Sequence, residues 1–208
     1  MDNNDKYIWR MTDYNNIGFI LQNGLHCCNC EIQDPNFISI GHKTLIESRG
    51  QSPLHIRPFG VLNDYVPFYF HYKMPMLHNI YTKKVPSYKG AQEDIIYIIS
   101  TIKKIEELEL LFLFTDRHAY LAHKNIFYSP NDLDKLRWEI INNDDWHKTY
   151  SEIKKELKQA EFLVHKHLPV SAIAGIVVHN DIVATFVKNE IDKYGSKLEV
   201  AIKPNFYF

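Results

Sequence analysis

Four polar side chains stand at the edges of apolar segments of this chain. Thr12 follows the first apolar run, Arg49 follows a short helix, and His118 and Glu161 flank two further apolar runs. A carboxylate, an imidazole and a guanidinium can move protons or stabilise developing charge, and strand ends often carry sites. Each residue also has a structural explanation. Arg49, beside Glu47, can be an ordinary solvated surface residue. Glu161 can be the last carboxylate of an amphipathic helix.

A second group of reactive side chains is the run "HCCNC" at residues 26–30. Thiolates and imidazoles are the usual ligands of zinc, and "HKH" at 165–167 offers a distant pair of histidines. A structural zinc site usually draws four ligands from two separated pairs, and the chain has no other cysteines. We therefore expect a loop after a helix and no metal site. Three clustered cysteines also suit a reducing compartment better than a disulfide framework.

The stretch "LNDYVPFYFHYKMPML" at residues 62–77 combines five aromatic side chains with two prolines. A strand with one wet face alternates apolar and polar residues, whereas residues 65–70 are apolar or aromatic throughout. The stretch therefore predicts a wall of aromatic side chains. Alternation along a strand places Phe68 and Phe70 on one face, so only part of this wall can line a site.

Length and composition bound the elements that must position these groups. With 208 residues, 45% hydrophobic residues and a formal net charge of −1, the chain predicts a single domain spanning 1–208. The polar N-terminal run "MDNNDKYIWR" and the lack of a long apolar segment predict a cytoplasmic protein without a membrane span.

The expected elements alternate between strands and helices, which predicts the α+β class. Strands are expected at 7–11, 94–100, 108–114, 160–169, 173–180 and 198–208, and helices at 15–25, 43–48 and 181–195. No Gly-rich dinucleotide turn, H-E-x-x-H or G-x-S-x-G motif occurs.

Five segments together resemble the DarT family of DNA ADP-ribosyltransferase toxins: "YIWRMTDYNNIGFILQNGLHC", "ISIGHKTLIESRG", "LNDYVPFYFHYKMPML", "LFLFTDRHAY" and "KQAEFLVHKHLP". The resemblance covers nearly the whole chain, and the branch that modifies thymine in single-stranded DNA is the nearest. It implies a split mixed sheet like that of the PARP-like ADP-ribosyltransferases, surrounded by helices, with NAD as substrate and no metal.

The resemblance also assigns roles to residues. Glu161 matches the catalytic glutamate, Arg49 the essential arginine, and His118 a substrate-positioning histidine. The implied NAD contacts, besides Arg49, are Thr12, Asp13, Asn16, Tyr65, Phe68 and Tyr69. Family members often carry histidine where this chain has Asp13, and we expect the backbone to make the contact there.

The segment after His118, "RHAYLAHKNIFYSPNDLDKLRW", interleaves cations and aromatic rings, as single-strand-binding surfaces do. Its place resembles the substrate loop of the family, which makes Arg117, Lys124, Asn125, Tyr128 and Arg137 the expected DNA contacts. Two other functions remain open: an ADP-ribosyltransferase acting on protein or RNA, and a non-catalytic nucleic-acid-binding module. The family further implies a macrodomain antitoxin, like DarG, as a partner.

Overall fold

The protein is described by a computed structural model in which residues 6–208 are placed. Its main element is an eight-stranded mixed sheet of order β10-β9-β4-β1-β3-β7-β5-β6. The β10–β9 pair is parallel and the other pairs are antiparallel. The strands are β1 Tyr7–Asp13, β3 Tyr65–Tyr69, β4 Ile95–Thr101, β5 Phe112–Thr115, β6 Ile126–Phe127, β7 Glu161–His165, β9 Gly175–Val178 and β10 Val200–Ile202. A separate small ladder joins β2 Leu25–His26 to β8 His167–Leu168.

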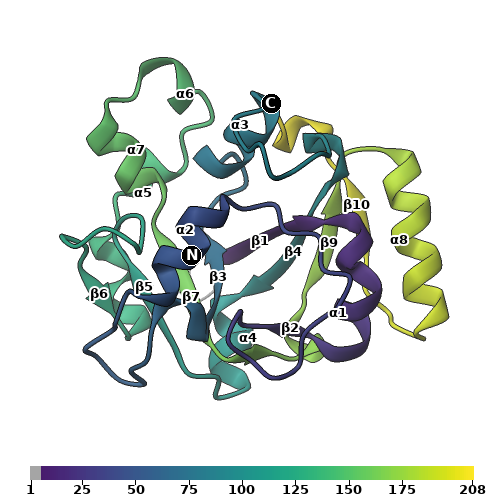
Figure 1. Ribbon diagram of the computed structural model, residues 1–208, viewed down its shortest axis with the longest axis horizontal. Coiled ribbons are helices and arrows are strands. Elements are labelled where there is room, and N and C mark those ends of the chain that lie inside the picture. Colours follow the sequence, from purple (N-terminus) through teal and green to yellow (C-terminus); the bar gives the residue numbers. More distant parts are fainter. Residues whose placement is uncertain (1–5) are drawn as a thin grey trace.

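Helices cover both halves of the sheet. They are α1 Ile17–Asn23, α2 Lys43–Gly50, α3 Pro75–Tyr81, α4 Ile102–Glu107, α5 Trp138–Ile141, α6 Trp146–Thr149, α7 Glu152–Lys158 and α8 Asp181–Lys193. Helix α8 contacts α1 and β10, whereas α5 and α7 contact each other at the opposite end of the molecule (Figure 1). Within residues 6–208, none of the helices is long and apolar enough to cross a membrane.

The sheet is nearly split between β1 and β3. Only Trp9 and Tyr69 are paired across this junction, whereas β1 pairs with β4 along its whole length. Pro67 occupies the middle of β3, and its ring removes the N–H that a neighbouring strand would need. The Pro67 carbonyl instead accepts a hydrogen bond from Arg10 Nη1 at 3.2 Å. The sequence thus opens a gap in the sheet and places a guanidinium in it.

Strand β3 shows why the aromatic wall has two faces. Val66, Phe68 and Phe70 are at most 5% exposed and belong to the largest hydrophobic core cluster. Tyr65 and Tyr69, on alternate positions, line the cavity described below. The ring of Phe68, expected to contact NAD, instead lies in the core and does not line this cavity, because the pleat directs it to the opposite face of β3.

Most expected elements are present, with three differences. The strand expected at 108–114 begins only at Phe112, because the chain first ends helix α4, where the N–H of Leu110 bonds the Ile105 carbonyl at 3.0 Å. The strand expected at 160–169 breaks at Lys166, whose φ is 60°. The strand expected at 198–208 ends at Ile202, and a 3-10 turn begins at Pro204.

Candidate active site

Glu161 and Arg49 form a buried ion pair at the centre of the molecule. Arg49 lies in the last turn of α2, and Glu161 is the first residue of β7, directly opposite Tyr69 of β3. Arg49 Nη1 lies 3.1 Å from Glu161 Oε1, and Nη2 lies 3.0 Å from Oε2. Glu161 is 1% exposed and Arg49 is 9% exposed. The guanidinium therefore holds the carboxylate in two-point geometry.

The segment after β5 supplies further donors to the same carboxylate. The Ala119 N–H donates to Glu161 Oε1 at 2.9 Å, and His118 Nδ1 lies 3.2 Å from that oxygen. His118 Nδ1 also lies 3.2 Å from the Tyr120 nitrogen. A protonated Nδ1 can donate to Glu161, whereas an unprotonated Nδ1 can accept the Tyr120 N–H. His118 thus contacts Glu161 directly, and its Nδ1 lies within hydrogen-bond distance of both Glu161 and the Tyr120 nitrogen.

The pKa of Glu161 follows from these neighbours. Burial alone would raise it, because it removes the charged carboxylate from water. The charge of Arg49 and the hydrogen bond and charge of His118 outweigh burial and hold the pKa well below its usual range. Glu161 is therefore ionised at neutral pH, and it is a weak base as long as Arg49 stays in place.

The ion pair opens into a cavity of about 250 Å³. Its wall includes side chains from β1, β3, β7 and α2, together with the loop between β2 and α2. Arg49, His118 and Glu161 lie at this cavity, as do Tyr65 and Tyr69. The Tyr65 hydroxyl donates to the Phe59 carbonyl at 2.8 Å, so its ring is fixed in place. The structure thus brings together the three predicted catalytic side chains and two predicted aromatic contacts.

Thr12 and Asn16 also line this cavity. Asn16 Nδ2 donates to Thr12 Oγ1 at 2.8 Å and to the Ile38 carbonyl at 2.9 Å, and its Oδ1 accepts the Ile38 N–H at 2.9 Å. Asn16 therefore ties the segment around Ile38 to the end of β1. This holds one wall of the cavity against the strand that carries Thr12.

The Asp13 side chain makes local contacts and does not line the cavity that contains Glu161. Its carboxylate caps the turn after β1 by accepting the Asn15 N–H at 2.9 Å, and it accepts the Tyr88 hydroxyl at 2.7 Å. It faces an adjoining cavity of about 700 Å³. The Asp13 side chain is thus held away from Glu161, because two local donors already use it.

Arg10 is a cavity residue that the sequence reasoning missed. Its guanidinium lies in the gap between β1 and β3, and its buried Nε has no hydrogen-bond partner within residues 6–208. Burial lowers the pKa of Arg10 to about 10, so the group remains charged at neutral pH. A buried cation with an unused donor is unfavourable unless an anion binds it. The signal in the sequence was a charged residue inside the apolar strand "YIWRM".

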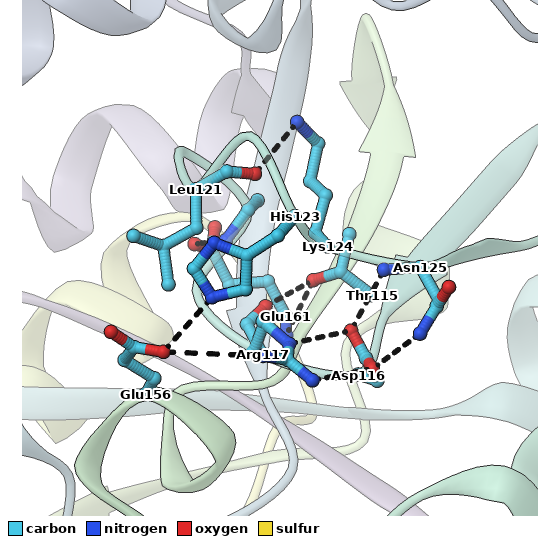
Figure 2. Close-up of polar contacts among 10 residues, drawn as sticks. Thr115, Asp116, Arg117, Leu121, His123, Lys124, Asn125, Glu156 and Glu161 are labelled. Carbon is cyan, nitrogen blue, oxygen red and sulfur yellow. Dashed lines mark hydrogen bonds and ion pairs between the residues drawn. The ribbon is translucent and has the colours of Figure 1, made fainter. Parts of the chain in front are cut away.

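A network around Asp116 braces the loop after His118 (Figure 2). Arg117 donates from Nε and Nη2 to the two Asp116 oxygens at 3.3 Å each, and Asn125 donates from its backbone N at 2.9 Å and from Nδ2 at 2.8 Å. Glu156 of α7 lies 4.0 Å from Arg117 Nη1 and 3.1 Å from His123 Nε2. Arg117 and Asn125 were both expected to contact DNA, but their side chains form hydrogen bonds to Asp116 within the loop.

Of the other three expected DNA contacts, Tyr128 and Arg137 are exposed and Lys124 is partly exposed. Tyr128 is 65% exposed, and the Arg137 side chain is 59% exposed beside Glu139. Lys124 donates from Nζ to the Leu121 carbonyl at 3.2 Å. Burial lowers the pKa of Lys124, and the charges of Glu161 and Arg49 also act on it. The Lys124 ammonium group therefore interacts electrostatically with both members of the ion pair.

The three cysteines lie in a loop, as expected, but this loop follows strand β2 and not a helix. Within residues 6–208, no group of three or more His, Cys, Asp or Glu side chains is arranged to hold a metal ion. The sequence reasoning overlooked that Cys27 and Cys30 form a C-x-x-C pair.

Solved structures share this fold. Thermus sp. 2.9 DarT in complex with ADP-ribosylated ssDNA matches with a TM-score of 0.92 and 32% identity, over 98% of this chain and 97% of that chain. The same protein in complex with NAD+ matches with a TM-score of 0.88. Thermosipho africanus DarTG in complex with ADP-ribose has a TM-score of 0.76 at 19% identity, with 98% of this chain aligned to 51% of that one. The expected α+β ADP-ribosyltransferase fold is confirmed.

Sequence comparison adds the family. The family model of DarT, ssDNA thymidine ADP-ribosyltransferase, matches residues 9–208. A DNA ADP-ribosyl transferase of Escherichia coli O127:H6 is 34% identical over 97% of this chain and 93% of its own length. The chain belongs to the DarT family. It is an enzyme that uses NAD as substrate to ADP-ribosylate DNA, which confirms the expected activity.

Proposed function

We propose that the cavity around Glu161 binds NAD and that the transfer of ADP-ribose to a thymine base of single-stranded DNA takes place there, with release of nicotinamide. The observation that carries this assignment is the buried carboxylate of Glu161, held by Arg49 and facing the tyrosines of β3. Breaking the bond between ribose and nicotinamide develops positive charge on the ribose. A fixed, ionised carboxylate stabilises that charge.

Glu161 acts first as this electrostatic stabiliser. Its pKa is held well below the usual range, mainly by Arg49 opposing the effect of burial, so it accepts a proton poorly in this arrangement. Taking the proton from the attacking base nitrogen requires Arg49 or His118 to move away first. His118 lies at the start of the proposed substrate loop, so DNA that binds this loop can move His118 away from Glu161. Proton transfer to Glu161 then follows DNA binding.

The NAD pyrophosphate is assigned to Arg10 together with Arg49. Arg49 Nη1 donates a hydrogen bond to Glu161 and Nη2 is in ion-pair contact with it at 3.0 Å, whereas Arg10 Nε is buried and has no hydrogen-bond partner among residues 6–208. Asp34 also lines the cavity, so the formal charges of the two arginines are matched by two carboxylates, and the anion is assigned to the unpartnered Nε of Arg10. Tyr65 and Tyr69 supply ring contacts to nicotinamide, and Thr12 seats its amide.

DNA is assigned to the exposed side of the loop after His118. Tyr128 offers a ring for base stacking, and Lys124 and Arg137 offer cations for phosphates. Arg117 and Asn125 act through Asp116, by holding the shape of the loop. In this proposal residues 1–208 form one transferase domain that binds both NAD and DNA.

Transfer of label from NAD tests the substrate. Labelled NAD is incubated with single-stranded oligonucleotides that contain or lack thymine, with RNA and with protein, and the products are analysed by mass spectrometry. We expect label on thymine-containing DNA only. Label confined to RNA or protein selects the rival enzyme, and DNA binding without any label selects the non-catalytic module.

Arg49→Ala tests the machinery within that assay. Its loss leaves Glu161 without its two-point partner, so activity should fall to near background. Lys43→Ala, a cation at the start of the same helix, is the matched control and should keep nearly the full rate. A near-normal rate for Arg49→Ala would return Arg49 to a structural role.

A macrodomain antitoxin is the proposed partner, and the bacterial cytoplasm is the proposed location. ADP-ribose on template bases blocks replication, so an enzyme with this activity needs a counterpart that removes the modification. Expression of the wild type alone should stop bacterial growth, Glu161→Ala should not, and co-expression of a macrodomain protein should restore growth. Equal toxicity of wild type and Glu161→Ala would show that the harm has another cause.

A further inference from the structure

The loop between β2 and α2 contains a pair of thiols in close contact. Cys27 Sγ and Cys30 Sγ lie 2.8 Å apart, within a turn closed by the Cys30 N–H bonding the Cys27 carbonyl at 3.2 Å. Cys27 is 1% exposed and Cys30 is partly exposed. Cys28, between them, is exposed and lines the cavity that contains Glu161. We call residues 26–33 the cysteine loop.

Hydrogen bonds to Lys166 and from Gln33 hold the cysteine loop, and with it the two sulfurs, in place. The Cys27 N–H donates to the Lys166 carbonyl at 2.8 Å, and Cys30 Sγ donates to the same carbonyl at 3.1 Å. Gln33 Nε2 donates to the carbonyls of Cys27, Cys28 and Cys30 at 3.0, 3.1 and 2.7 Å. The loop is thus fixed to the residue that follows β7 and closed by its own glutamine.

We propose that Cys27 and Cys30 are a redox modification site, at which a small-molecule disulfide converts the two thiols reversibly into an intramolecular disulfide that stiffens this wall of the NAD cavity. Sulfurs already in contact need to approach by less than 1 Å to reach the ~2.05 Å bond length. Oxidation leaves no buried group unpaired, because the Lys166 carbonyl keeps the Cys27 N–H. A disulfide of this kind in a reducing compartment is transient and regulatory.

The roles of the two sulfurs follow from their exposure. Burial, together with the neighbouring Cys30, raises the pKa of the Cys27 thiol to about 12, so Cys27 is a poor nucleophile. Cys30, as its thiolate, attacks one sulfur of oxidised glutathione and expels one glutathione thiolate. Cys27 Sγ then loses its proton, attacks the Cys30 sulfur and expels the second glutathione. Two protein thiols become one disulfide, and one oxidised glutathione becomes two reduced molecules.

Thiol counting and peptide mapping test the bond itself. The reduced protein has three titratable thiols in its unfolded state. After oxidised glutathione it should have one, with a Cys27–Cys30 linkage in non-reduced peptides and full recovery with dithiothreitol. Cys28→Ser is the matched control and should still lose two thiols, whereas Cys30→Ser should form no internal disulfide. Three remaining thiols, a stable mixed disulfide of Cys30 with glutathione, or a protein disulfide through Cys28 would overturn the proposal.

Two further measurements test the coupling to the cavity. Amide hydrogen exchange in residues 28–33 should slow in the oxidised protein, and this readout needs neither NAD nor DNA. The effect on NAD rests on the proposed function: a pre-ordered wall should lower the KM for NAD by about two- to tenfold with little change in kcat. Unchanged exchange would refute the stiffening. Slower exchange with an unchanged KM would refute the coupling and leave the proposed transfer chemistry intact.

Discussion

Replacing Glu161 with glutamine separates the charge of this residue from its size. The glutamine keeps the volume and retains an oxygen that can accept the Ala119 N–H, now 2.9 Å from Glu161 Oε1. It removes the negative charge that faces Arg49. Two effects follow from that single loss, one on the rate and one on stability.

The rate effect comes from the lost stabilisation of positive charge on the ribose. Removing one pre-organised electrostatic group at a reacting centre lowers kcat by about 10²- to 10³-fold, or ~2.7–4 kcal/mol. The assay is transfer of label from NAD to a thymine-containing oligonucleotide, with both substrates saturating. The KM for NAD should change much less than kcat, because Arg10 and the tyrosines remain.

The stability effect comes from the unpaired guanidinium. Removing one partner of a buried ion pair lowers the free energy of unfolding by about 3–5 kcal/mol. The Glu161 pKa is depressed in the folded state, so its contribution is full above the unfolded value of ~4.3 and is lost as the pH falls towards the folded value. In urea titrations the free energy of unfolding of the wild type should therefore exceed that of Glu161→Gln most at pH 7. This difference should become progressively smaller below about pH 4.

Glu156→Gln is the matched control. Glu156 also pairs with a histidine and an arginine, but its side chain is 29% exposed. The Glu156→Gln variant should lose less than about 1 kcal/mol of its free energy of unfolding and keep most of its transfer activity. A kcat for Glu161→Gln within tenfold of wild type would refute the electrostatic role. A difference in the free energy of unfolding between wild type and Glu161→Gln that grew as the pH fell would refute the assigned direction of the Glu161 pKa shift.

Four other substitutions follow from the same structure. Phe68→Ala should lower the free energy of unfolding by about 3–5 kcal/mol in urea, since it empties a core position, and a change confined to NAD binding would contradict the core assignment. Asp116→Ala should cost about 2 kcal/mol and raise the KM for DNA more than that for NAD, measured by steady-state kinetics. Tyr128→Ala should weaken binding of a single-stranded oligonucleotide by ~1–3 kcal/mol in fluorescence anisotropy, and an unchanged Kd would remove it from the DNA surface. Arg137→Ala should reduce the salt slope of log K by about 0.7, and an unaltered slope would show that it meets no phosphate.

Local sequence was enough to predict most elements and the class of the fold. The helix expected at 15–25 ends before Gly24, which has a φ of 77°, and the helix expected at 181–195 ends before Gly195, which has a φ of 64°. Glycine reaches these backbone angles without strain, so the signal is local. Recognition of "LNDYVPFYF" and its companion segments supplied the activity and pointed to Glu161 and Arg49.

Tertiary structure decided how the side chains meet. Arg49 and Glu161 are 112 residues apart in the chain, and only the folding of α2 over the start of β7 brings them within 3.1 Å. The same holds for Arg10, whose place in the gap depends on Pro67 in another strand. Asp13, Arg117 and Asn125 were given site roles by position in a motif, yet nearby donors and acceptors engage their side chains. Spacing along a strand sets which face a residue occupies, but the pairing of distant segments sets what that face contacts.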